Sequence, residues 1–154
     1  MVVIAALLIA ATVSSTEATS ELTDSERLLQ LHRAVMQAHL DQDVEAILED
    51  EAEGYVVASR GQVDTPTKQQ RRDRLGSYLA ATNFTVYRDE IEPIVRVSED
   101  GTLGWIIVRV CARGTQITSS GESRPIEFIS AWIELYKKGN GHWLRVGNVS
   151  NFEQ

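Results

Sequence analysis

Apolar residues recur every three or four positions over residues 24–40, a stretch without glycine or proline, and this spacing predicts an amphipathic helix. Thr23 and Glu26, at the start of the stretch, have the spacing of a capping box. A second, shorter helix is predicted over residues 43–49. The folded part of the chain is therefore expected to begin with two helices.

Two further elements precede the second half of the chain. Residues 55–59 are predicted to form a short strand, and Gly61 closes it on the C-terminal side. Thr65 is then predicted to cap a third helix, with Pro66 at its first position and Ala81 near its end.

The second half of the chain is rich in β-branched and aromatic residues and is interrupted by turn-forming residues. Four long strands are predicted, over residues 84–98, 103–116, 126–137 and 143–152. Short turns between them favour antiparallel pairing, and Pro93 indicates an edge position or a bulge in the first of them. Helices grouped first and strands grouped last predict an α+β fold, with the helices packed on one face of a curved antiparallel sheet.

The amino-terminal segment has a different character. Residues 2–11 are an unbroken apolar run that is too short to cross a bilayer but has the length found in secretory signals. No basic residue precedes the run, since the first one is Arg27. We expect residues 1–20 to be a signal peptide or a disordered leader, and residues 21–154 to form one domain. The mature protein would then be secreted or periplasmic without a membrane span; a cytoplasmic location is the alternative.

Composition narrows the possible partners. With 154 residues, of which 43% are apolar and 24% charged, the chain fits one globular domain. Its 15 basic and 22 acidic residues give a formal charge of −7, so its surface repels phosphate backbones and we expect no nucleic-acid partner. The single cysteine, Cys111, lies in an apolar run and is expected to be buried and inert.

The order of the predicted elements is that of a known family. The stretches that carry the resemblance are Ala38–Asp41, Ser98–Gly101, Ala131–Tyr136 and Trp143–Ser150. Over residues 24–152 the chain resembles the NTF2-like superfamily, which includes ketosteroid isomerases, scytalone dehydratase and SnoaL-like polyketide cyclases. It is most similar to SnoaL-like and DUF4440-type proteins. The resemblance implies a cone-shaped α+β fold with a pocket between the helices and the sheet, and a homodimer formed through the outer sheet face.

Two histidines, His32 and His39, lie seven residues apart on the apolar side of the first predicted helix. Each is either a core histidine with a buried polar partner or a pocket residue that acts in acid–base chemistry or hydrogen bonding. Their spacing is not the i, i+4 of a helical zinc site, and no third acidic ligand is obvious. We therefore expect no metal and no cofactor.

Strand alternation supplies further candidates for the pocket. Those predicted to face inward are Trp105, Arg109, Trp132, Glu134, Asn148 and Ser150; for the last two, the resemblance implies the same. An inward pair of Arg109 and Glu134 would mark a pocket, because buried charges need partners; the alternative places both in solvent or at the dimer interface. A register slip of one residue would reverse these faces. Tyr55 and Tyr78 are candidates for hydroxyls at the pocket rim or for aromatic core packing.

Three functions are compatible with these features. The favoured one is a pocket protein that binds a small apolar or carbonyl-containing molecule. The second is an isomerase, dehydratase or cyclase in which His32 and His39 serve as base and acid and Glu134 orients them. The third is a non-catalytic dimerisation domain whose concave face is filled by side chains.

Overall fold

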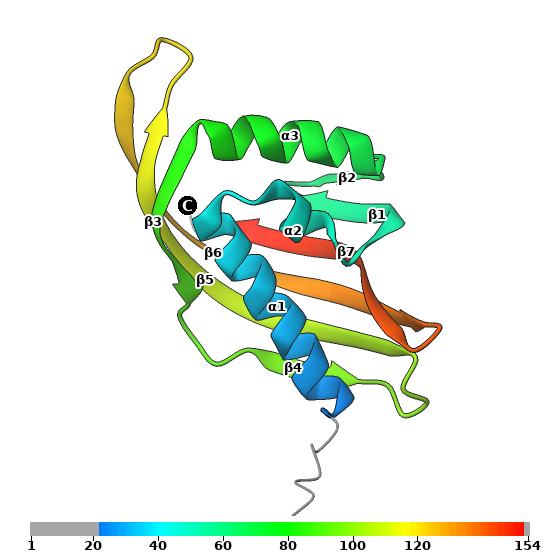
Figure 1. The fold of residues 1–154 in the computed structure, drawn as a ribbon. Helices are drawn as coiled ribbons and strands as arrows, with labels where there is room; N and C mark the ends of the chain where they lie inside the picture. The colour runs from blue at the N-terminus through cyan, green and yellow to red at the C-terminus, as the bar shows by residue number, and fades with distance from the viewer. Residues whose placement is uncertain (1–21, 153–154) are drawn as a thin grey trace, which may run out of the picture.

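The computed structural model describes residues 22–152, in which three helices pack on one strongly curved sheet (Figure 1). The predicted signal peptide or leader, residues 1–20, lies outside the described residues, and the export that it suggests stays a prediction. Within residues 22–152, no helix combines the length and the apolar composition that a bilayer crossing requires.

The first two helices form where the apolar spacing predicts them. Helix α1 spans Asp24–Asp41 and α2 spans Val44–Leu48. At the start of α1 the Thr23 hydroxyl accepts from the backbone of Glu26, and the Glu26 carboxylate accepts from the backbone of Thr23, so the predicted capping box is confirmed. Helix α1 ends at Gln42, whose φ of 58° lies in the left-handed region and turns the chain toward α2.

Helix α3, Lys68–Ala80, begins two residues later than predicted. Its N-cap is Thr67, which forms a second capping box with Gln70, and not Thr65. The spacing of Thr67 and Gln70 satisfies two backbone N–H groups, and Pro66 is left before the cap as a buried residue. The predicted cap at Thr65 is therefore wrong.

Over the described part of the chain, seven strands form the sheet: β1 Glu51–Ser59, β2 Gln62–Asp64, β3 Thr82–Asp89, β4 Ile94–Val97, β5 Leu103–Ile117, β6 Ser123–Gly139 and β7 His142–Phe152. Their order is β2-β1-β7-β6-β5-β3, and β4 also pairs with β5. The pairs are antiparallel except β1 and β7, which run parallel, so the sheet is mixed and not purely antiparallel as predicted. The predicted strand over 84–98 is divided into β3 and β4, with Pro93, which has no N–H to donate, in the gap.

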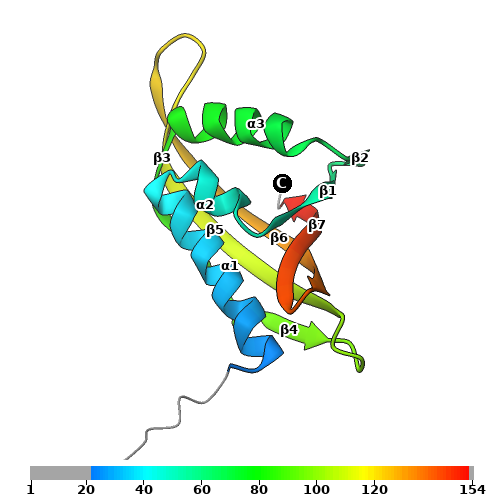
Figure 2. The ribbon, with the colours of Figure 1, turned by 45° about the vertical axis from the view of Figure 1, so that its right-hand side comes forward.

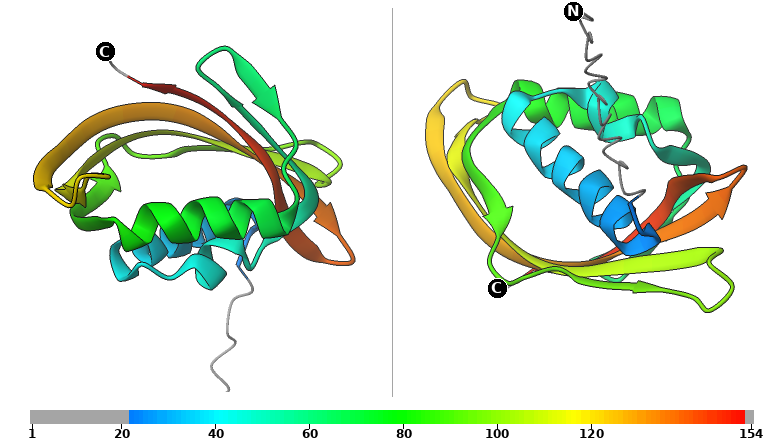
Figure 3. Two further views of the ribbon diagram at one scale, coloured as in Figure 1. Left: turned by 90° about the horizontal axis from the view of Figure 1, so that it is seen from above. Right: turned by 60° about the horizontal axis from the view of Figure 1, so that its bottom comes forward.

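The helices cover the concave face of the sheet (Figure 2). Helix α1 lies diagonally across it, and α3 crosses its upper part from the side of β1 to the side of β3 (Figure 3). Close approach of α1 depends on Gly104 of β5, since a Cβ there would lie 2.5 Å from Cδ1 of Leu28. Beneath α1 a buried core contains Leu28, Met36, Ile106, Val108, Val110, Tyr136 and Trp143.

The register of the last three strands decides which side chains face the helices. Glu134 of β6 lies opposite Ile106 of β5 and opposite Asn148 of β7, so these positions share the concave face. The pairing of β6 with β7 then shifts by one residue, because Leu135 pairs with Gly147 but Tyr136 pairs with Arg145. This bulge turns the side chain of Arg145 toward the helices.

Candidate functional site

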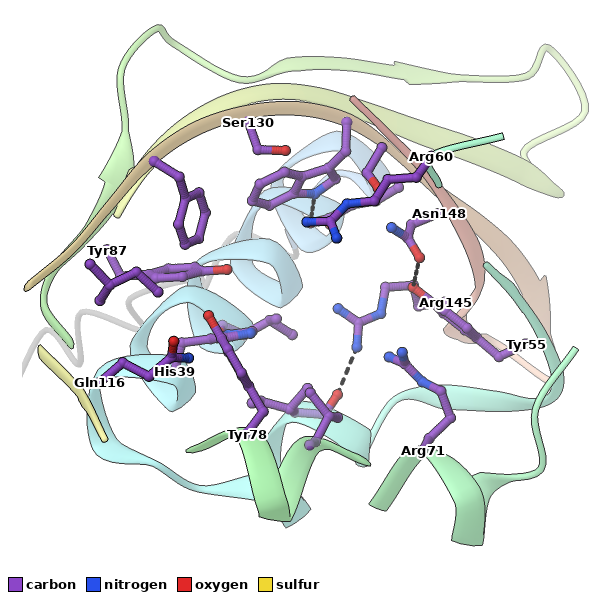
Figure 4. Close-up of a pocket in the computed structure, with 18 residues that line it drawn as sticks. His39, Tyr55, Arg60, Arg71, Tyr78, Tyr87, Gln116, Ser130, Arg145 and Asn148 are labelled. Atoms are coloured by element: carbon purple, nitrogen blue, oxygen red, sulfur yellow. Dashed lines mark hydrogen bonds between the residues drawn. The ribbon is translucent and has the colours of Figure 1, made fainter. Parts of the chain in front are cut away.

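A cavity of about 530 Å³ lies between α3, the C-terminal half of α1 and the concave face of the sheet (Figure 4). Its apolar wall consists of Val35, Ile47, Leu75, Ile126, Phe128 and Trp132. Three arginines, Arg60, Arg71 and Arg145, also line it. The cavity is therefore apolar on part of its surface and strongly cationic on another part.

His32 is fully buried, does not line the cavity and is hydrogen-bonded to two carboxylates. Its Nδ1 is 2.9 Å from Oε1 of Glu134, and its Nε2 is 3.1 Å from Oδ1 of Asp89. Burial by itself lowers the pKa of His32, but the hydrogen bonds and charges of these two carboxylates outweigh it and raise the pKa to about 9. At neutral pH His32 is therefore an imidazolium that donates from both ring nitrogens.

Glu134 accepts hydrogen bonds on both carboxylate oxygens. Oε1 accepts from His32 and from Nε1 of Trp132 at 2.9 Å, and Oε2 accepts from the hydroxyl of Tyr136 at 2.6 Å. Burial would raise the pKa of this carboxyl, but the hydrogen bond and charge of His32, together with the charge of Arg145, lower it to about 2. Glu134 is thus a fixed negative charge and a poor proton acceptor.

His39 lines the cavity in a single protonation state. Its Nδ1 lies 2.8 Å from the carbonyl oxygen of Val35, which can only accept, so Nδ1 carries the proton and Nε2 holds a lone pair. The ring stacks on Tyr87, with centroids 4.4 Å apart and planes 7° apart. Burial, reinforced by the charge of Arg145, lowers the pKa of His39 to about 4 even though the hydrogen bond to Val35 opposes the shift. His39 is therefore a neutral hydrogen-bond acceptor at neutral pH.

On the other side of the cavity, Arg71 and Arg145 both donate hydrogen bonds to the buried carboxylate of Glu51. Arg71 of α3 donates from Nε and Nη2 to the two oxygens of Glu51, at 2.8 and 2.9 Å. Arg145 of β7 donates from Nη2 to the same carboxylate at 3.3 Å and to the carbonyl oxygen of Ile47 at 2.7 Å. The Tyr55 ring packs against both guanidiniums, whose Cζ atoms lie 4.5 Å (Arg71) and 5.6 Å (Arg145) from its centroid.

Polar groups from β1 and β7 complete this side. The Tyr55 hydroxyl donates to Oδ1 of Asn148 at 3.2 Å, which leaves the amide nitrogen of Asn148 available as a donor. The Ser150 hydroxyl donates to the Ser59 hydroxyl at 2.8 Å. Arg60, in the tight turn between β1 and β2, extends into the cavity (Figure 4). Within residues 22–152, no group of three or more His, Cys, Asp or Glu side chains is arranged to hold a metal ion.

The arrangement of helices and sheet was compared with known proteins. No protein-family model and no curated protein matches the chain. An NTF2-like protein from Cytophaga hutchinsonii superposes with a TM-score of 0.68 at 14% identity, over 86% of this chain and 100% of that one. A ketosteroid isomerase-like protein from Erwinia carotovora atroseptica gives 0.62 at 17% identity, over 85% and 97%. The chain has the NTF2-like fold.

A third structure with this fold is named for the association domain of calcium/calmodulin-dependent protein kinase II and comes from Xanthomonas campestris. It superposes with a TM-score of 0.60 at 12% identity, over 94% of this chain and 98% of that one. At such identities the likeness is one of fold, so the chemistry of the site has to be argued from its own residues.

The NTF2-like fold brings most of the sequence-predicted site residues together. Those that line the cavity are His39, Tyr55, Tyr78, Trp132, Glu134, Asn148 and Ser150. His32 contacts Glu134 from behind and does not line the cavity. Of the two alternatives for the histidines, His32 follows the core one and His39 the pocket one.

The predicted placement of Trp105 and Arg109 in the pocket is wrong. On β5, Gly104, Ile106 and Val108 face the helices and are buried, so the residues between them face the opposite side of the sheet. Trp105 is 37% exposed there, and Arg109 lies 3.6 Å from Glu90 and is not paired with Glu134. The predicted inward positions on β5 are displaced by one residue, and in a strand such a displacement moves every side chain to the opposite face.

Sequence reasoning missed all three cavity arginines. Arg71 had a signal, because Arg71, Leu75 and Tyr78 recur at i, i+4 and i+7 on one face of α3. Lys68, Arg72 and Arg74 are basic as well, however, and such a cluster of charges is typical of a solvated helix face. Arg145 had none, since its inward direction depends on the bulge in β7. Arg60 lies in a turn, where no periodicity indicates the direction of a side chain.

Proposed function

We propose that this protein binds a small apolar or carbonyl-containing molecule in the cavity. The observation that carries the proposal is the cavity volume of about 530 Å³, within the roughly 300–1,000 Å³ typical of small-molecule sites. Aromatic and aliphatic walls with a few fixed polar groups are the usual composition of such sites. The open volume favours a binding function over a dimerisation domain whose concave face is filled by side chains.

Proton transfer on the bound molecule, as in an isomerase, dehydratase or cyclase, is the second candidate, and His39 favours it. The lone pair on its Nε2 is an acceptor for a substrate proton. His32 is not available to accept a substrate proton, because both of its ring nitrogens are hydrogen-bonded to carboxylates. Glu134 contacts His32 and not His39, so the expected triad is replaced by a single candidate base.

Binding is tested with 2-acetonaphthone, a small aromatic ketone, titrated by isothermal calorimetry. We expect saturable binding that is lost when Leu75→Trp fills the cavity from α3. Ser77→Trp, on the exposed side of the same helix, is the matched control and should bind like the wild type. Equal binding by the two variants would contradict a ligand site in the cavity.

The same probe separates binding from catalysis. In D2O, a base beside the bound ketone exchanges the protons of its methyl group for deuterium, which proton NMR follows. Exchange that the wild type accelerates and His39→Leu does not would support proton transfer by His39. Binding without accelerated exchange would support a binding protein.

We further propose that a second copy of the chain covers the outer face of the sheet. Adjacent strands place apolar side chains side by side there, forming an outer apolar patch of Ile94, Trp105, Ile107, Ile133, Leu135 and Val149. Exposed fractions of 37% for Trp105 and 47% for Val149 are costly in a monomer, and contiguous apolar patches commonly mark interfaces. The neighbour named for an association domain is consistent with assembly by this fold.

A further inference from the structure

We propose that the cavity recognises a neutral ligand at two points. Arg145 and Asn148 donate hydrogen bonds to a carbonyl oxygen of the ligand, and Nε2 of His39 accepts one from a hydroxyl group elsewhere on the same molecule. This inference rests on the proposed binding function and specifies its ligand, an apolar molecule that carries both a carbonyl and a hydroxyl group. These three residues would determine the specificity of the site.

Arg145 provides the first donor, because its guanidinium is buried and only partly paired. The residue is 6% exposed, and its Nη2 donates to Ile47 and Glu51. Within residues 22–152, Nε and Nη1 have no acceptor, and of these two only Nε is fully enclosed by protein. Figure 4 shows the guanidinium among the side chains that line the cavity. Nη1 is therefore a donor that a ligand can reach, and an acceptor there would offset the cost of leaving it unpaired.

Asn148 provides a second donor on the same side of the cavity (Figure 4). Tyr55 contacts both residues, since its hydroxyl donates to Oδ1 of Asn148 and its ring packs against the guanidinium of Arg145. The amide nitrogen of Asn148 makes no hydrogen bond to the described part of the chain. A carbonyl oxygen has two lone pairs, so one such oxygen can accept from both Nη1 of Arg145 and this amide.

The charges around these donors favour a neutral acceptor over an anion. Three cationic and three anionic side chains are paired beside the cavity: Arg71, Arg145, His32, Glu51, Asp89 and Glu134. Arg60 also lines the cavity, but it is exposed, so water screens its charge. An anion would therefore add an unpaired charge to a poorly hydrated site, whereas a carbonyl oxygen would not.

His39 of α1 provides the acceptor. Its Nδ1 donates to the carbonyl oxygen of Val35, and the lone pair of Nε2 receives no hydrogen bond from residues 22–152. Burial lowers the pKa of His39 to about 4, so Nε2 accepts a hydrogen bond from a hydroxyl group without removing its proton. His39, Arg145 and Asn148 line the same cavity of about 530 Å³, so one small molecule can contact all three.

The remaining wall describes the body of the ligand. Leu75, Phe128 and Trp132 line the cavity with aliphatic and aromatic side chains, and Tyr87 stacks on His39. Such a wall binds a flat apolar body by removing its surface from water. A suitable probe is 6-hydroxy-2-acetonaphthone, in which a naphthalene body separates the ketone from the hydroxyl group.

The first test titrates the wild-type protein by isothermal calorimetry with 6-hydroxy-2-acetonaphthone and with 2-acetonaphthone, which lacks the hydroxyl group. We expect the hydroxy ketone to bind about tenfold more tightly, the scale of one hydrogen bond. Equal affinities for the two ketones would overturn recognition of a hydroxyl group.

His39→Phe assigns the hydroxyl group to its acceptor. The variant keeps a ring beside Tyr87 and removes the lone pair, so it should weaken the hydroxy ketone about tenfold and 2-acetonaphthone less than about twofold. His142→Phe, the same change at an exposed position, is the matched control and should alter neither affinity. An equal loss for both ketones in folded His39→Phe would overturn the role of His39.

Asn148→Asp tests the carbonyl end, with 6-ethyl-2-naphthol as a ligand that lacks the carbonyl oxygen. The variant keeps the oxygen that accepts from Tyr55 and removes the donor, so it should weaken both ketones about tenfold and the naphthol less than about twofold. Asn151→Asp, at an exposed position of the same strand, is the control and should change nothing. Unchanged ketone affinities, or an equal loss for all three ligands, would overturn the carbonyl site.

An absorbance titration of the bound hydroxy ketone tests its orientation. Burial and a hydrogen bond to a lone pair both favour the neutral naphthol, so binding should raise the pKa of its hydroxyl group. A lowered pKa would place the hydroxyl group at Arg145 and would overturn the assignment of the two ends. Failure of all three ligands to bind would instead overturn the proposed binding function.

Discussion

Two histidines on one helical stripe have opposite chemistry, because each finds different partners. His32 meets two carboxylates and is held as a cation, whereas His39 meets a main-chain carbonyl and is held neutral. The pKa of His32 is raised to about 9, and that of His39 is lowered to about 4. One residue type at equivalent helical positions therefore serves as a structural charge in one case and as a cavity acceptor in the other.

Matched leucine substitutions should separate these roles. His32→Leu leaves Glu134 and Asp89 without their cation, and we expect the free energy of unfolding to fall by about 3–5 kcal/mol. His39→Leu should change it by no more than about 1 kcal/mol, because the Val35 carbonyl still accepts its helical backbone bond. Urea denaturation measures both. Similar losses in the two variants would contradict the assignment.

At the scale of the element, single irregularities in strands redirect whole sets of side chains. The bulge in β7 places the side chain of Arg145 on the concave face. The regular alternation of β5 places the side chains of Trp105 and Arg109 on the convex face. Arg145 therefore lies on the concave face, where it lines the cavity, and Trp105 lies on the convex face, where it is part of the outer apolar patch. Both proposals about function depend on this distribution.

The outer apolar patch gives a test of self-association. We expect the wild type to be a dimer in light scattering after size exclusion, and Trp105→Glu to be a monomer, because a charge would then be buried at the interface. Val63→Glu, at an exposed position on edge strand β2, is the control and should remain dimeric. A monomeric wild type, or a Trp105→Glu variant that still dimerises, would rule out this interface.

For the whole molecule, the buried ionisable groups set how stability depends on pH. Glu134 has its pKa lowered from 4.5 to about 2, and His39 has its pKa lowered from 6.5 to about 4. The unfolded chain therefore binds more protons than the folded one over these ranges, and stability rises with pH through both of them. His32, raised from 6.5 to about 9, has the opposite effect, since its contribution is complete below 6.5 and is lost as pH rises toward 9.

Stability should therefore be greatest near pH 6.5 and decline on both sides. Urea midpoints measured from pH 3 to pH 9 test this expectation. Asp89→Asn removes one partner of His32 and should reduce the alkaline decline, whereas Asp73→Asn, on the exposed side of α3, should leave it unchanged. A flat profile between pH 6.5 and 9 would show that His32 is not held as a cation.

The sequence by itself determined the elements of this protein, because helical spacing, capping residues and turn residues act over a few neighbouring positions. The order of helices and strands, the capping box of α1 and the α+β class are readable in this way. Only the tertiary structure decided the parallel pairing of β1 with β7, the faces of β5 and β7, and the partners of each histidine. Those depend on register and on residues as far apart as Glu51 and Arg145, whose contact no local pattern encodes.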